Sequence, residues 1–136
     1  ALTACLRAPH YLERQSRLLA DNCENINEMN VAMGHWVAAH VPPGDTVAIN
    51  DAGAIRFFGQ RRTLDLVGLN NHELVSVGRN RLMKREKPDV LVIFPGWFKK
   101  WPAKKKYEPV HSITAENYTI CRCRNQHEIV AYQRRE

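Results

Sequence analysis

The first third of the chain carries a helical pattern of apolar and small polar positions. Between residues 11 and 40 they recur in steps of three and four, at Tyr11, Gln15, Leu18, Asn22, Ile26, Met29, Met33, Val37 and His40. This spacing predicts one amphipathic helix of about 30 residues, about 45 Å long at 1.5 Å per residue. We expect this helix to pack across the protein's own sheet rather than in a coiled-coil dimer, because Gln15 and Asn22 would weaken a coiled-coil seam.

Three short apolar runs, at residues 47–49, 64–67 and 90–94, predict buried strands. The first two runs flank a segment long enough for only one or two helical turns. A strand, a short helix and a second strand predict parallel pairing with a right-handed crossover. We expect the Asp51 carboxylate to cap this short helix and Gly59 to end it in the left-handed conformation.

The second half of the chain predicts one further helix and a hairpin. Asn70 and Glu73 stand in capping-box spacing ahead of a helix that reaches about residue 85. A basic loop over residues 97–109 follows the third strand, and alternating runs at 111–124 and 128–135 predict an antiparallel hairpin at the sheet edge.

Together these elements predict a single α/β domain over residues 1–136, with residues 1–8 as a loose lead-in. We expect a short, mainly parallel sheet with an antiparallel C-terminal hairpin. The long N-terminal helix would pack on this sheet in a three-layer, Rossmann-like arrangement.

Composition and charge narrow the class of partner only slightly. Twenty Lys and Arg against fourteen Asp and Glu give a formal charge of +6, which favours anionic partners in general. No apolar run approaches the ~20 residues that span a bilayer. The four cysteines, Cys5, Cys23, Cys121 and Cys123, lack the spacing of a zinc site and are expected as a disulfide or as buried thiols. We therefore expect no metal and no cofactor.

A polar crevice is expected where the parallel strands end, since ligands bind at the carboxyl ends of strands in open parallel sheets. It would collect Asn50, Asp51, Gly68, Asn70 and Asn71. Asp51 and Asp65 suggest a pair of catalytic carboxylates, but structural roles are favoured: Asp51 as a cap, and Asp65 paired with Arg61, Arg62 or a backbone group. No glycine-rich phosphate loop accompanies them.

A basic, aromatic segment follows the third strand. Its candidate membrane or anion contacts are Lys99, Lys100, Trp101, Lys104, Lys105 and Lys106, and Trp97 is a candidate ligand contact. Lysines interleaved with tryptophans are typical of single-stranded nucleic-acid binding and also of a membrane interface. The simplest interpretation is a solvated loop. No fold signature of nucleic-acid binding is present, and we expect no nucleic-acid partner.

The order of several motifs resembles a known family. These are a Gly-x-Trp pair ending the first helix at Gly34 and Trp36, the pattern VAINDAGAIRFFGQRRTLDLVGLNN at residues 47–71, IFPGWF at 93–98, and VAYQ near the end. The likeness spans nearly the whole chain. It is similar to the C-terminal extracytoplasmic domain of bacterial multi-spanning glycosyltransferases that use lipid-phosphosugars, like the dolichyl-phosphate-mannose mannosyltransferases.

The resemblance implies a non-catalytic domain on the periplasmic face of the cytoplasmic membrane. The acid that activates the acceptor in that family lies between its first membrane helices, so Asp51 would not inherit the role. The implied partners are the membrane portion of the same polypeptide, anionic lipid, or a polyprenyl-phosphate sugar. A membrane segment would then precede Ala1, and we expect residues 97–107 on the same side of the domain. A small enzyme using Asp51 and a nucleic-acid-binding module remain the alternatives.

Overall fold

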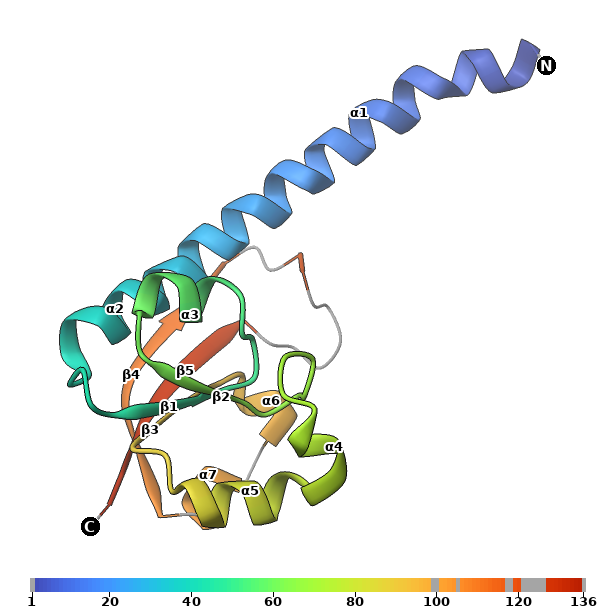
Figure 1. The fold of residues 1–136 in the computed structure, drawn as a ribbon. Helices are drawn as coiled ribbons and strands as arrows, with labels where there is room; N and C mark the ends of the chain where they lie inside the picture. The colour runs from blue at the N-terminus through green and yellow to red at the C-terminus, as the bar shows by residue number, and fades with distance from the viewer. Residues whose placement is uncertain (1, 99–100, 105, 117–118, 121–126, 136) are drawn as a thin grey trace.

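A computed structural model describes residues 2–98, 101–104, 106–116, 119–120 and 127–135, with only the backbone of residues 2–8, 103 and 104 (Figure 1). The helical elements are α1 (Leu2–Asn25), the π-helix η1 (Ile26–Val31), α2 (Ala32–His40), α3 (Ala54–Gly59), α4 (Glu73–Val77), α5 (Arg79–Glu86), α6 (Pro95–Phe98) and α7 (Trp101–Lys104). The strands are β1 (Thr46–Ile49), β2 (Arg62–Asp65), β3 (Val90–Ile93), β4 (Tyr107–Thr114) and β5 (Glu128–Arg134).

The five strands form one mixed sheet in the order β2-β1-β3-β5-β4. β1 pairs in parallel with β2 and β3, while β5 is antiparallel to β3 and β4. The register of β4 shifts between Pro109 and His111. The predicted α/β class, the parallel β1–β2 unit and the antiparallel edge hairpin are confirmed, but the first strand of the hairpin begins at Tyr107 rather than at residue 111 and ends at Thr114. The sheet is mixed, because β5 runs antiparallel to both of its neighbours, β3 and β4.

Alternate residues of the parallel strands build an apolar cluster on each face of the sheet, as the period of two in a strand requires. Val47 and Val92 belong to the cluster that contains Met29, Met33 and Val37 of the long helical segment. Their neighbours along the strands, Ala48 and Leu91, belong to the cluster with Leu74, Leu82 and Phe98. β1 and β3 are therefore covered on both sides, which explains why they read as continuous apolar runs.

Two glycines allow α2 and α3 to pack closely. A Cβ on Gly34 would lie 2.9 Å from Phe58 Cβ and 3.1 Å from the Ala54 carbonyl oxygen, and a Cβ on Gly59 would lie 3.0 Å from Val37 Cγ1. The left-handed residue that ends α3 is Gln60, with φ of 48°, so the prediction for Gly59 was wrong. Gly59 is required by its contact with α2 rather than by its backbone conformation.

The long N-terminal helix packs on the sheet only over its second half. Helical structure begins at Leu2 rather than near residue 9, continues through η1 into α2, and includes Pro9. Burial begins at Asn25, which is 3% exposed, whereas Tyr11 and Leu19 are each 64% exposed. Figure 1 shows α1 projecting away from the sheet, so the prediction that the whole helix crosses it was wrong.

Two further predicted segments differ in the structure. The helix expected over residues 70–85 is split at Gly78, whose φ of 81° suits glycine, into α4 and α5. The expected basic loop contains α6 and α7 instead, and Phe98 is buried in the core.

Candidate functional site

The polar residues that follow β1 hold elements of the domain together. Asn50 Oδ1 accepts a 3.0 Å hydrogen bond from the backbone N–H of Phe94, which joins the ends of β1 and β3. The buried Asn30 of η1 donates through Nδ2 to Asp51 Oδ2 at 2.6 Å. No side-chain hydrogen bond caps α3, so the predicted capping role of Asp51 was wrong. Asp51 links η1 to the end of β1.

Asp65 organises the turn that follows β2. Its Oδ1 accepts hydrogen bonds from the backbone N–H of Val67 and Gly68, and its Oδ2 accepts one from Asn70 at 2.8 Å. Burial raises the pKa of Asp65, but the backbone hydrogen bonds outweigh it and hold the pKa below its ordinary value. Of the partners predicted for Asp65, the backbone is the one that binds its carboxylate in the described structure.

The predicted capping box of Asn70 and Glu73 is absent. His72 occupies the N-cap position of α4 with no side-chain hydrogen bond. The Asn70 N–H donates to Asp65, while the Glu73 carboxylate binds Arg85 Nη1 at 2.6 Å. Among the described residues, the amide side chains of Asn70 and Asn71 take no part in capping α4.

Asn70 and Asn71 line a cavity of about 220 Å³ beside the edge strand β2. The cavity is mostly polar, and its walls also include α3, α5 and β2. The other polar residues that line it are Arg56, Arg62, Thr63, Asp65, Glu73 and Glu86. The strand-end crevice expected from the sequence is thus divided: Asn70 and Asn71 reach this cavity, whereas Asn50 and Asp51 are absent from its lining.

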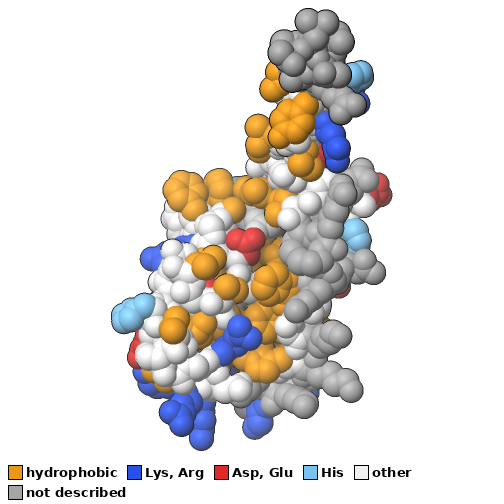
Figure 2. Space-filling model, turned by 90° about the vertical axis from the view of Figure 1, so that its right-hand side faces the viewer, with side chains coloured by type: hydrophobic (Ala, Val, Ile, Leu, Met, Phe, Trp, Pro, Cys, Tyr) orange, Lys and Arg blue, Asp and Glu red, His pale blue; other side chains and the backbone are white. Residues whose placement is uncertain are grey.

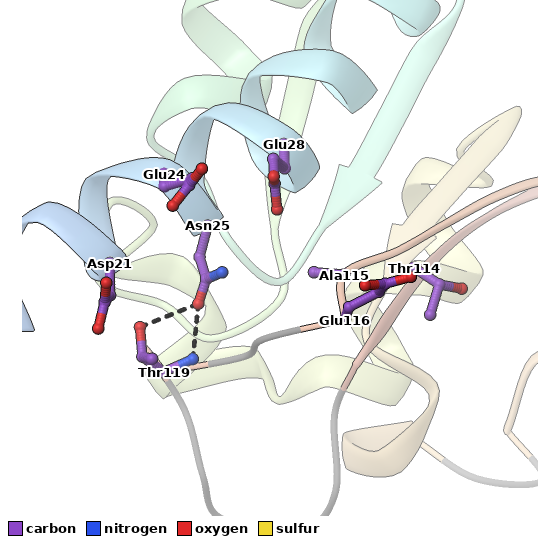
Figure 3. A pocket seen from close by; sticks show the side chains of 8 residues that line it. All are labelled: Asp21, Glu24, Asn25, Glu28, Thr114, Ala115, Glu116 and Thr119. Carbon is purple, nitrogen blue, oxygen red and sulfur yellow. Dashed lines mark hydrogen bonds between the residues drawn. The ribbon is translucent and has the colours of Figure 1, made fainter.

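A larger cavity, of about 540 Å³, lies between the helix and the end of β4 (Figure 3). Carboxylates of Asp21, Glu24, Glu28 and Glu116 line it, and Asn25 Oδ1 accepts hydrogen bonds from the Thr119 backbone and hydroxyl. The sequence analysis missed it, although Asp21, Glu24 and Glu28 recur at helical spacing. Among the described residues, no group of His, Cys, Asp or Glu is arranged to hold a metal ion.

The helix α7, which carries the candidate anion contact Trp101, lies away from the start of the N-terminal helix. Trp101 packs against Phe98, with ring centroids 5.4 Å apart, and its Nε1 donates to Asn80 at 3.3 Å. Figure 1 places α7 at the end of the molecule opposite to the start of α1, so the expected common side was wrong for this segment. Lys106 is exposed; Lys99, Lys100, Lys105 and the Lys104 side chain lie outside the described part of the structure.

Exposed apolar side chains occur along α1 and beyond the ends of β2 and β3. On α1 they are Tyr11, Leu12, Leu18 and Leu19. Beyond the strands, Leu69 is 87% exposed, Val75 83% and Trp97 42%. Figure 2, which views the side where α4 and α6 lie, shows hydrophobic side chains on both the body and the projecting helix.

Cys23 is exposed, contrary to the expected buried thiol. The side chains of the other three cysteines lie outside the described part of the structure.

Comparison with known proteins gives one match. A family model described as "Domain of unknown function (DUF8728)" matches residues 22–132. The match begins close to Asn25, where the long helix first becomes buried. Searches of curated proteins and of solved structures found no match. No helix in the described residues has both the length and the hydropathy to cross a membrane.

Proposed function

The chain belongs to this family of domains of unknown function, and we propose that it is a non-catalytic, extracytoplasmic domain of a multi-spanning membrane glycosyltransferase. The observation that supports this role is that the motif residues on which the resemblance rests make structural contacts within the domain. Asn50 binds β3, Asp51 binds η1, Asp65 binds its own turn, and Gly34 admits α3. A motif whose conspicuous acids and glycines hold the fold together is a structural signature, so the domain needs no catalytic acid of its own.

The projecting helix supports attachment to a larger assembly. α1 has 24 residues, about 36 Å at 1.5 Å per residue, and exposes Leu12 and Leu19 beyond the body of the domain. An apolar surface of this kind on a helix that leaves the domain is typical of an interaction site. We propose that the N-terminal part of α1, around Leu12, lies against the membrane portion of the same polypeptide, on the periplasmic face of the cytoplasmic membrane. Cys23, near the other end of α1, would stay accessible. In finer detail, the domain would have a short sheet in a three-layer, Rossmann-like arrangement.

The strand-end side is the better candidate for the surface that faces the membrane portion. Leu69, Val75 and Trp97 are exposed on this side. By contrast, α7, which Lys106 follows in the sequence, lies at the end of the molecule opposite to the start of α1. Large apolar residues beside an aromatic one suit the interfacial region of a bilayer. The domain would shape the membrane active site from this side, close to anionic lipid or a polyprenyl-phosphate sugar.

Labelling of Cys23 in intact cells tests the location. The intact protein is expressed with Cys23 as its one remaining cysteine and treated with a membrane-impermeant maleimide. Because Cys23 is exposed, we expect labelling without lysis. The matched control moves that cysteine to the fully buried Ala131, where the native protein should stay unlabelled before and after lysis. Labelling of Cys23 only after lysis would contradict the proposal.

Glycosyl transfer tests the non-catalytic role. We expect transfer from a polyprenyl-phosphate sugar by membranes that contain the intact protein, and none by residues 1–136 alone. The Asp51→Asn variant of the intact protein should keep its activity. Loss of transfer in that variant, with normal amounts of folded protein in the membrane, would favour instead an enzyme that uses Asp51.

A further inference from the structure

The cavity beside β2 contains polar side chains with no partner in the described structure. Arg56, Thr63, Asn70 and Asn71 line it, and their side chains make no hydrogen bond to any residue that the structure describes. They offer a guanidinium group, a hydroxyl and two amides, which together provide both donors and acceptors. The set lies along the edge strand β2: Thr63 is in the strand, Arg56 is on α3, and Asn70 and Asn71 follow the carboxyl end of the strand, where α/β sheets commonly bind ligands.

The charges around the cavity favour a neutral ligand. Three carboxylates, from Asp65, Glu73 and Glu86, line the cavity together with the guanidinium groups of Arg56 and Arg62. A third guanidinium group, from Arg85 outside the lining, binds both Glu73 and Glu86. Arg62 already binds Glu86 at 2.9 Å, which leaves Arg56 as the cation without a partner among the described lining residues. The charges around the cavity therefore nearly balance, and a neutral ligand is favoured over a phosphate.

The size of the cavity limits the ligand to a single small ring. Its volume of about 220 Å³ lies below the 300–1,000 Å³ range of pockets for drug-sized ligands. Its lining offers many hydrogen-bonding groups and little apolar surface, so the ligand must carry several groups that both donate and accept. Ring hydroxyls have this property, because each is one donor and two acceptor lone pairs.

We propose that this cavity binds one neutral sugar ring, held by Asn70, Asn71, Thr63 and Arg56. Asp65 fixes the turn on which the two asparagines stand, through its bond to the Asn70 N–H. The inference deepens the proposed function and rests on it for one point, namely that the ring belongs to the acceptor or product of glycosyl transfer. The sugar-phosphate portion of a lipid donor would not bind here.

Heteronuclear NMR on the 136-residue chain tests the proposal. The probes are the methyl α-pyranosides of mannose, glucose and galactose, with inorganic phosphate as the anionic comparison. We expect at least one glycoside to shift the side-chain amide signals of Asn70 and Asn71, and phosphate to leave them unchanged. Failure of all three glycosides to shift these signals, or shifts with phosphate alone, would overturn the proposal.

Variants locate the binding. Asn71→Ala and Arg56→Gln should each weaken glycoside binding about tenfold or more, the loss of roughly 1.4 kcal/mol of binding free energy. Asn27→Ala replaces an exposed asparagine of η1 that does not line the cavity, and should leave binding unchanged. Equal binding by all three variants would place the sugar elsewhere and overturn the inference.

The two proposals fail separately. Glycoside binding with Cys23 inaccessible in intact cells would leave the cavity as a sugar site and refute the location. Accessible Cys23 without glycoside binding would leave the location and refute the sugar site.

Discussion

Asn30 and Asp51, 21 residues apart in sequence, are joined by a 2.6 Å hydrogen bond from the Asn30 amide to the Asp51 carboxylate. Asn30 is only 5% exposed, so its amide has little access to water when the partner is removed. This bond fastens the π-helix to the end of the first strand. It gives the conspicuous acid of the motif a structural role.

Removal of the Asp51 carboxylate should therefore destabilise the fold. We expect Asp51→Ala to lower the free energy of unfolding by about 1–3 kcal/mol, because the buried Asn30 amide loses its acceptor. Asp51→Asn keeps an oxygen at that place and should cost less. Urea denaturation measures both. Asp21→Ala, at an exposed acid of α1, is the control and should change stability by less than about 0.5 kcal/mol. Equal effects of the Ala variants at 51 and 21 would contradict the role of the bond.

Gly34 should tolerate no side chain. Gly34→Ala would bring a Cβ to 2.9 Å from Phe58 Cβ and 3.1 Å from a backbone oxygen, so α2 and α3 must separate. We expect a loss of about 1–3 kcal/mol, the usual cost of overpacking. Gly44→Ala is the matched control, since no atom lies within 4 Å of its added Cβ. Thermal unfolding compares them, and a melting temperature for Gly34→Ala as high as that for Gly44→Ala would refute the close contact.

Asp65 should contribute stability that depends on pH. Its pKa is lowered in the folded protein, because hydrogen bonds from Asn70, Gly68, Val67 and Leu69 outweigh the effect of burial. The contribution is fully present above the unfolded pKa of about 3.9 and is lost as the pH falls through the folded pKa. The difference in unfolding free energy between the wild type and Asp65→Asn should therefore shrink as the pH is lowered from 6 toward and below about 3.9. Urea titrations at a series of pH values measure it, and a difference that stays constant or grows on acidification would show the sign to be wrong.

Arg61 and Arg62 are adjacent but should respond differently to replacement by lysine. Arg61 donates to the carbonyl oxygens of Val41 at 2.8 Å and Ala38 at 2.7 Å, and so holds the end of α2. A lysine lacks this planar fork, and we expect Arg61→Lys to cost about 1–2 kcal/mol. Arg62→Lys changes an exposed pair with Glu86 and should cost less than about 0.5 kcal/mol. Chemical denaturation of the two variants gives the comparison, and equal losses would contradict it.

The elements that follow from hydrophobic periodicity were predictable from the sequence. Met29, Met33 and Val37 recur at helical spacing and are buried, and the runs around Val47 and Val92 are strands. The projection of α1 was not predictable, because an apolar stripe has the same period whether or not something covers it. Tyr11 and Leu18 continue the pattern of Met29 without its burial.

Local capping rules failed where a distant residue provided a better partner. Asp51 binds Asn30 instead of the start of α3, and Glu73 binds Arg85 instead of the N-terminus of α4. The site was partly predictable, because Asn70 and Asn71 come after the end of β2 and the position of that strand was predicted. The contribution of Arg56 depends on α3 lying beside the edge strand, which no short-range pattern specifies.

The two ends of the sheet both discourage association with further strands. β4, at one edge, contains Pro109, which cannot donate a backbone hydrogen bond, and its register shifts there. β2, at the other edge, has only four residues and begins with the exposed Arg62. Short, charged or bulged edges are the means by which natural proteins avoid templated aggregation. At high concentration, growth of this protein into fibrils by strand addition is therefore disfavoured at either edge.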